Sequence, residues 1–275
     1  MKIQIRDLPV NYEIFGQGRP LVMLPGWTMS ARSLAHLIEP IIGNRKGWQR
    51  IYIDPPGHGA TPGADWITNL DQMLDLLLET IDVLVDGQRF VLYGLSLGAY
   101  LARGVLYHRH QDVDGLSILV PAIITEDSRR NVPDPTVLVE EPGIMDKLTA
   151  DEKDMFEIIV VRTTSFLNSF RDFPQPFEGE AGNMVFLDNI RQEPERYSCS
   201  FDVDQLSRPF PGPTLIIAGR QDAVVGYKDA WNILDNYPRA TFVVADRAGH
   251  FMEEKTELIN TLMNEWLDRV EEYVK

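Results

Sequence analysis

The 275-residue sequence has one cysteine, no cluster of Lys and Arg, and no long uninterrupted apolar run. A membrane helix needs about 20 consecutive apolar residues, so the sequence argues against a membrane-spanning protein. The single cysteine, Cys199, cannot form an intrachain disulfide, which indicates a reducing compartment. The first six residues, MKIQIR, alternate polar and apolar side chains and lack the apolar stretch of a signal peptide. We therefore expect a soluble, cytoplasmic protein.

Positive charge is also scarce: 41 Asp and Glu against 26 Lys and Arg give a net charge of −15. Nucleic acids and anionic membrane surfaces attract positive charge, so the balance argues against both as partners. Hydrophobic residues make up 44% of the chain, which is enough for one large α/β domain or for a core with an insertion. We therefore expect a small-molecule substrate as the binding partner. The charge and composition do not decide whether the protein forms a homodimer.

Short apolar runs alternate with segments of helical periodicity over most of the chain. The expected strands are 2–6, 10–15, 20–26, 50–57, 90–94, 115–122, 214–219 and 240–246, and the expected helices lie near 31–39, 69–85, 97–107, 227–236 and 256–272. Uniformly apolar strands that alternate with helices are typical of a parallel sheet covered on both faces. The alternation stops between residues 123 and 208, where six prolines and helical patterns near 149–170 and 181–192 occur. We expect residues 1–122 and 209–275 to form the core, with 123–208 inserted upon it as a mainly helical lid.

Residues 93–100, YGLSLGAY, place Ser96 between two glycines directly after an apolar strand. Gly94 and Gly98 permit backbone angles and close approaches that a Cβ atom forbids. A strand, a sharp turn and a helix around such a serine present its hydroxyl for nucleophilic attack. The alternative interpretation is an ordinary tight turn that needs small residues.

A nucleophilic serine needs a base to take its proton and an acid to orient that base. His250 lies in a Gly-containing loop after the last expected strand, at the sheet edge where parallel sheets collect active residues. Asp222 follows the preceding strand and is the favoured acid. Asp246 lies only four residues before His250 in the same loop and is the less favoured one. The chain order Ser96, Asp222, His250 is that of nucleophile-elbow enzymes.

Attack of a serine on a carbonyl creates an oxyanion, which fixed backbone N–H groups stabilise. The N–H of Leu97, directly after Ser96, is one expected donor. The other is the N–H of Trp27, in the loop that follows the strand 20–26. For that loop, an ordinary Pro-Gly turn is the alternative.

Together these patterns resemble the α/β-hydrolase superfamily of serine hydrolases, in the subgroup with an inserted helical lid. The resemblance covers nearly the whole chain outside 123–208 and rests on GLSLG at 94–98, DPPGHG at 54–59, GRQD at 219–222 and AGH at 248–250. It implies a mostly parallel eight-stranded sheet with helices on both faces and a lid between the sixth and seventh strands. It also implies catalytic roles for Ser96, Asp222 and His250. Relatives commonly have His-Gly at the oxyanion loop, where this chain has Pro25-Gly26.

The segment 123–208, called the lid segment below, contains 18 Asp and Glu against 9 Lys and Arg, a net charge of −9. We expect it to repel multiply charged substrates such as phosphate esters and CoA thioesters. Arg129, Arg162 and Arg171 are candidates to hold a single carboxylate. Its aromatic side chains are expected mostly to pack against the core, with a few lining a pocket; they are Phe156, Phe166, Phe170, Phe173, Phe177 and Phe186.

The predicted reaction is hydrolysis of a small neutral or weakly charged ester with an apolar portion, through an acyl group on Ser96. It needs no cofactor and no metal; His108 and His110 would point apart on a helix and form no metal site. Two alternatives stay open. One is hydrolysis of a carbon–carbon bond in a ketone substrate. The other is a small-molecule receptor that signals through the lid segment and retains residual hydrolase activity.

Overall fold

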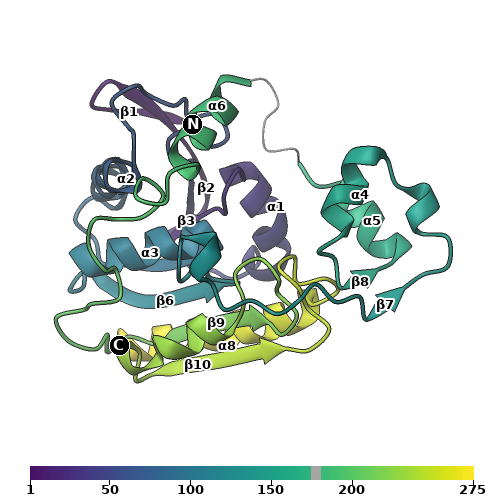
Figure 1. Cartoon of the computed structure of the whole chain (residues 1–275). Helices are drawn as coiled ribbons and strands as arrows, with labels where there is room; N and C mark the ends of the chain where they lie inside the picture. Colours follow the sequence, from purple (N-terminus) through teal and green to yellow (C-terminus); the bar gives the residue numbers. More distant parts are fainter. Residues whose placement is uncertain (175–180) are drawn as a thin grey trace.

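The computed structural model describes residues 1–174 and 181–275, in which helices pack on both sides of an eight-stranded sheet (Figure 1). The strands of this sheet are β1 (Lys2–Ile5), β2 (Leu8–Gly16), β3 (Gly18–Leu24), β4 (Gly47–Ile53), β5 (Phe90–Leu95), β6 (Val113–Leu119), β9 (Thr214–Gly219) and β10 (Ala240–Ala245). The helices outside the lid segment are α1 (Ala31–Ile42), α2 (Leu70–Val85), α3 (Leu97–His108), α7 (Lys228–Asn232) and α8 (Thr256–Tyr273).

The strand order is β1-β2-β4-β3-β5-β6-β9-β10. The pairs β1–β2 and β2–β4 are antiparallel, and every other neighbouring pair is parallel. The expected mostly parallel sheet of eight strands is therefore confirmed. Its topology gathers the carboxyl ends of β3, β5, β6, β9 and β10 along one edge, where loops can bring distant residues together.

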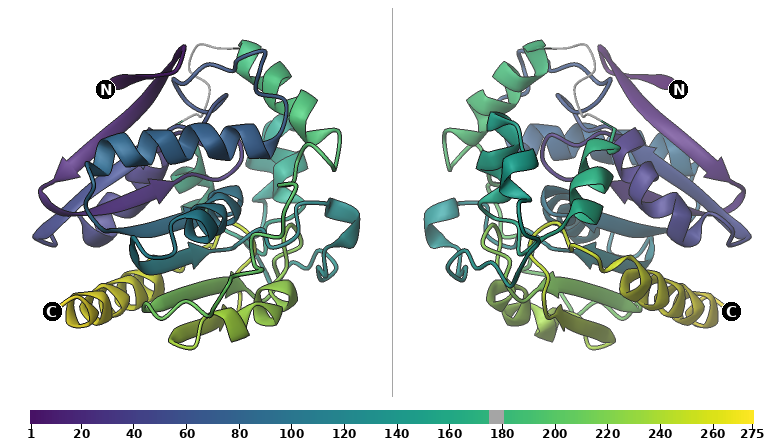
Figure 2. Two further views of the ribbon diagram at one scale, coloured as in Figure 1. Left: turned by 90° about the vertical axis from the view of Figure 1, so that its left-hand side faces the viewer. Right: turned by 90° about the vertical axis from the view of Figure 1, so that its right-hand side faces the viewer.

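Alternate residues of β5 enter two different cores, one on each face of the sheet. Leu92 packs in the cluster that contains α2 and α3, whereas Val91 and Tyr93 pack in the cluster that contains α1 and α8. These helices can be followed in Figure 2, with α2 and α3 in blue and α8 in yellow. Because both faces are covered, the parallel strands are apolar throughout rather than alternating.

The lid segment lies between β6 and β9, and its first part differs from the helical pattern expected near 149–170. That stretch is divided into α4 (Ala150–Phe156), β8 (Val161–Arg162) and α5 (Thr164–Arg171), and β8 pairs with β7 (Val139–Glu140). The β-branched run Ile158-Ile159-Val160-Val161 disfavours helix and favours an extended chain. Thr163 then starts α5, because its hydroxyl oxygen accepts the N–H of Phe166 at 3.1 Å.

The lid segment packs as two separate parts. The first has a small core of its own, formed by Ile144, Leu148, Phe156, Ile159 and Leu167. The second begins with α6 (Ala181–Arg191), whose Leu187 and Ile190 join the main core beside α2 and α3. The boundaries at residues 123 and 208 stay predictions, and Phe177 lies outside the described residues. None of the described helices combines the length and apolar character needed to cross a bilayer.

His58, in the loop after β4, is completely buried. Its ring packs edge-on against Trp27, with 5.6 Å between ring centroids. The Nδ1 atom lies 3.0 Å from the carbonyl oxygen of Pro56, and among the described residues Nε2 has no hydrogen-bond partner. Burial lowers the pKa of His58 to about 4, because a charged imidazole would lose its hydration there.

This lowered pKa predicts a loss of stability in acid. Between the ordinary imidazole pKa of 6.5 and the folded value of about 4, the unfolded chain binds a proton that the folded protein does not. The free energy of unfolding should therefore fall by about 3 kcal/mol from pH 7 to pH 4 on account of this group alone. Urea unfolding of the wild type and of His58→Phe, which keeps a ring but cannot titrate, measures the difference. The same pH dependence in both proteins would contradict this role for His58.

Candidate active site

Ser96 occupies the sharp turn between β5 and α3, at φ 52° and ψ −113°. A positive φ is uncommon for a residue other than glycine, and such strain persists only where the surroundings hold it. Here the Ser96 N–H donates to the carbonyl of Leu119 at 3.0 Å, and the Ser96 carbonyl accepts from Ala99 at 3.0 Å and from Ala122 at 3.2 Å. These bonds hold the strained serine at the carboxyl edge of the sheet.

The two elbow glycines are required by close backbone packing. A Cβ atom on Gly94 would lie 2.3 Å from the carbonyl oxygen of Gly98, in the first turn of α3. A Cβ atom on Gly98 would lie 2.2 Å from the carbonyl oxygen of Leu24, at the end of β3. Helix α3 can therefore begin directly against β5 and β3 only if both positions lack a side chain.

His250 joins Ser96 to Asp222. Its Nε2 lies 3.1 Å from the Ser96 Oγ, and its Nδ1 lies 2.9 Å from the Asp222 Oδ2. The Asp222 carboxylate is fully buried, and its other oxygen accepts the N–H groups of Val224 at 2.8 Å and Val225 at 2.9 Å. With Nδ1–H donating to the carboxylate, Nε2 is the atom able to take the serine proton.

The competing acid, Asp246, is exposed and accepts a hydrogen bond from the Gln221 side chain at 3.1 Å. That bond is the main cause of its lowered pKa, with a further contribution from the Arg247 N–H. Among the described residues, the carboxylate within hydrogen-bond distance of His250 is that of Asp222. The structure thus brings together the three residues expected from the sequence, while their catalytic roles stay a prediction.

The turn that carries Trp27 lies against the serine. The Met29 N–H donates to the Gly26 carbonyl at 3.1 Å and closes the turn, in which Thr28 has a φ of 65°. A Cβ atom on Gly26 would lie only 3.4 Å from the Ser96 Cβ. Leu97 is the first residue of α3, a position whose N–H has no acceptor within its own helix. This placement suits both N–H groups as oxyanion donors, a role that stays a prediction.

Glu253 is a further residue of this region that the sequence patterns do not single out. Its carboxylate is 1% exposed; Oε2 accepts the Gly249 N–H at 2.7 Å and Oε1 accepts the Val160 N–H at 3.3 Å. Its neighbours Met252 and Glu254 both have positive φ, so the loop is strained. The carboxylate therefore ties the loop that carries the histidine to the lid segment. The sequence FMEE offers no sign of which of its two acids is buried.

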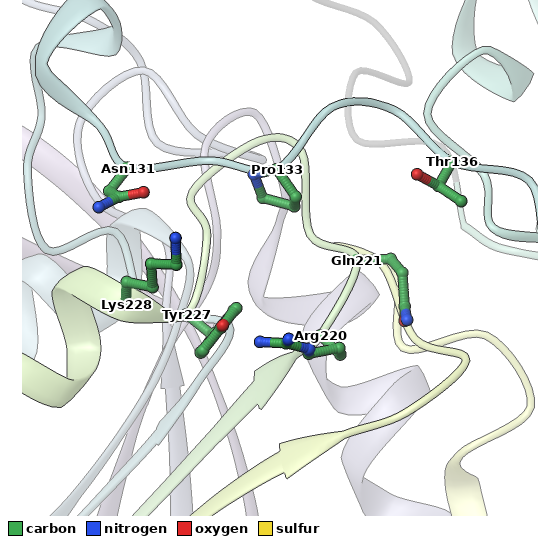
Figure 3. Close-up of a pocket in the computed structure, with 7 residues that line it drawn as sticks. All are labelled: Asn131, Pro133, Thr136, Arg220, Gln221, Tyr227 and Lys228. Atoms are coloured by element: carbon green, nitrogen blue, oxygen red, sulfur yellow. The ribbon is translucent and has the colours of Figure 1, made fainter.

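A groove of about 290 Å³ lies beside this loop but does not contain the serine (Figure 3). Its lining residues are Asn131, Pro133, Thr136, Arg220, Gln221, Tyr227 and Lys228. The Gln221 side chain connects the groove to the loop after β10, because its Oε1 accepts the Ala248 N–H at 3.2 Å. In the part of the chain that the structure describes, no group of three or more His, Cys, Asp or Glu is placed to hold a metal ion.

Comparison with known proteins gives a family match over most of the chain. The model of the alpha/beta hydrolase family matches residues 21–260. The pimeloyl-[acyl-carrier protein] methyl ester esterase of Legionella pneumophila (strain Corby) is 25% identical over 260 residues, which cover 94% of this chain and 99% of that protein. The non-heme chloroperoxidase CPO-A1 of Kitasatospora aureofaciens is 26% identical over 230 residues, 78% of each chain. An alpha/beta superfamily hydrolase from Oenococcus oeni PSU-1 has a similar fold, with a TM-score of 0.84 at 24% identity, covering 98% of this chain and 99% of that one.

The contacts of Asp222 predict a large effect of removing its charge. In Asp222→Asn the amide no longer fixes the Nδ1–H tautomer of His250, and we expect kcat for an activated ester to fall by about 10³–10⁴. Asp246→Asn is the matched control, because it removes the same charge from the exposed acid and should change kcat far less. Steady-state kinetics with p-nitrophenyl butyrate compares them. A larger loss in Asp246→Asn than in Asp222→Asn would reject the assignment.

Glu253 and Glu254 allow a second matched comparison. Glu253→Ala leaves two buried N–H groups without an acceptor, which should lower the free energy of unfolding by about 2–6 kcal/mol. Glu254→Ala removes one exposed hydrogen bond from the Thr163 hydroxyl, and its effect should be about 1 kcal/mol or less. Urea unfolding at pH 7 measures both. Equal losses would show that the buried carboxylate does not hold the loop.

Proposed function

The chain belongs to the alpha/beta hydrolase family, and from this premise we propose that it hydrolyses small carboxylic esters through Ser96. The observation that carries the proposal is the hydrogen-bonded series Ser96, His250, Asp222 at the carboxyl edge of the sheet. A hydroxyl, a base within reach of it and an acid that orients the base are the parts of an activated serine nucleophile.

In the proposed reaction, His250 Nε2 takes the Ser96 proton as Oγ attacks the ester carbonyl. The N–H groups of Leu97 and Trp27 hold the oxyanion, and its collapse expels the alcohol, which receives the proton from His250. A water molecule, deprotonated by the same imidazole, then attacks the acyl carbonyl, and the acid leaves as the imidazolium returns the proton to the Ser96 Oγ. Asp222 stays ionised throughout and stabilises the imidazolium. No step needs a cofactor.

Two observations support an ester without a polyanionic group as the substrate. The similar protein from Legionella is named as a methyl ester esterase, which supports ester hydrolysis. The lid segment carries 18 acidic against 9 basic residues, so a polyanionic group such as CoA would be repelled at the site. We propose that the substrate is an ester with an apolar portion and that the protein hydrolyses it in the cytoplasm.

A series of p-nitrophenyl esters from acetyl to octanoyl tests this function. Each methylene buried contributes about 0.8 kcal/mol, so kcat/KM should rise up to about fourfold per carbon until the pocket is filled. An acyl-CoA of the best chain length should react slowly at low salt and faster when salt screens the lid charge. Ser96→Ala should lower ester turnover by orders of magnitude. Absence of turnover for every ester, or a wild-type rate in Ser96→Ala, would reject the function.

A further inference from the structure

Arg191, the last residue of α6, lies against the turn that touches the serine. Its guanidinium carbon is 5.8 Å from the ring centroid of Trp27 and 5.3 Å from that of Tyr197. The two rings are themselves packed edge-on at 4.9 Å. Since Trp27 belongs to the turn beside Ser96, these contacts connect a positive charge of the lid segment to the turn that carries an expected oxyanion donor.

Helix α6 is held firmly enough to give Arg191 a defined position. The Asn183 side chain is 3% exposed, and its Oδ1 accepts the Gly63 N–H at 3.2 Å. A Cβ atom on Gly57 would lie 2.4 Å from the Phe186 ring, so helix and loop are in direct contact. The helix is thus docked on the loop after β4.

Two arginines share one carboxylate at this place. Asp127 lies 2.6 Å from the Arg130 Nη1 through one oxygen and 3.1 Å from the Arg191 Nη2 through the other. The Arg130 side chain is 5% exposed, and its other N–H groups donate to the backbone carbonyls of Ile124, Thr125 and Val224. Two guanidinium groups thus meet at one carboxylate, within a segment whose net charge is −9.

Arg191 is the member of this group with hydrogen-bonding capacity to spare. Its side chain is 35% exposed, and within the described residues it donates one hydrogen bond, to Asp127. A guanidinium has five N–H donors, so the remaining ones are able to bind another acceptor. Charges of this group and of Asp222 act on the same guanidinium. Burial is the main cause of the lowered pKa of Arg130, and the positive charge of Arg191 lowers that pKa further. The negative charges of Asp127 and Asp222 raise it.

The arginines that the sequence suggested for this task are engaged elsewhere. Arg162 pairs with Glu140 at 3.0 Å and Arg171 with Glu152 at 2.7 Å, both in the part of the lid segment that has its own core. Arg129 is 71% exposed and lies 3.7 Å from Glu126. Arg191, by contrast, contacts the Trp27 ring of the turn beside Ser96.

We propose that Arg191 binds a free carboxylate of the substrate, so that the enzyme prefers esters with one negative charge over neutral esters of equal length. The proposal rests on the proposed ester hydrolysis and names the substrate class of that site. One carboxylate can accept the N–H donors of Arg191 that Asp127 leaves free, whereas a polyanion also meets the acidic residues of the lid segment. Charge-assisted hydrogen bonds from a guanidinium correspond to a preference of about 10- to 100-fold.

The test compares charged and neutral esters in two series, with proton release followed in a pH-stat. The first series compares linear monomethyl dicarboxylates, whose free carboxylate lies in the acyl part, with the matching dimethyl esters. The second series compares acetoxyacetate, whose free carboxylate lies in the alcohol part, with its methyl ester. In at least one series we expect the charged ester to have the higher kcat/KM, by about tenfold or more. The series that shows the preference identifies which part of the substrate Arg191 holds.

Three variants separate charge recognition from packing. Arg191→Gln should abolish the preference, and Arg191→Lys should keep part of it, because an ammonium retains the charge without the planar donors. Arg196→Gln removes a charge from an exposed side chain that bonds only the Asn189 carbonyl among the described residues, and the preference should persist. Added salt should weaken the wild-type preference.

Two results would overturn the inference while leaving ester hydrolysis intact. One is hydrolysis of neutral esters with no preference for either charged series. The other is an equal loss for charged and neutral esters in Arg191→Gln, which would mean that the side chain only packs on Trp27. If neither charged nor neutral esters were hydrolysed at all, the proposed function would fail and this inference with it.

Discussion

The hydrogen bond between His250 Nδ1 and Asp222 Oδ2, at 2.9 Å, is the contact on which the site depends. It joins the loops that follow two neighbouring parallel strands, β9 and β10. These loops approach so closely that a Cβ atom on Gly219 would lie 2.5 Å from the carbonyl oxygens of Ala248 and Gly249. The fully buried Asp222 carboxylate also accepts the N–H groups of Val224 and Val225, and these hydrogen bonds offset the cost of its burial. The imidazole is thereby aimed at Ser96, which its own turn holds in a strained conformation.

Much of this arrangement is predictable from the sequence, because it follows from local rules. Apolar strands alternating with helices predict a covered parallel sheet, and the glycines at 94 and 98 predict the elbow. The positions of Asp222 and His250 after successive strands then place both at one edge. The split of 149–170 into two helices is also local in origin, since the β-branched residues from Ile158 to Val161 carry the signal.

The roles of Glu253 and Arg191 are of another kind, because they depend on contacts between segments far apart in the chain. One of the two N–H groups that satisfy the buried Glu253 comes from Val160, 93 residues earlier in the chain. Arg191 contacts Trp27 because helix α6, which ends at Arg191, is docked on the loop after β4. The charge count of the lid segment describes its average and not the local arrangement in which Arg130 and Arg191 share Asp127. A segment can thus repel polyanions as a whole and still bind one carboxylate, as we propose.

The most direct test of the account is to find where the acyl group is carried. The full-length protein is mixed with excess p-nitrophenyl butyrate, quenched in acid within the first turnovers, and digested for mass spectrometry of its peptides. The account predicts a butyryl group on Ser96 and none in Ser96→Ala. Butyryl transfer to another residue, such as Cys199, or ester turnover with Ser96 unmodified, would contradict it.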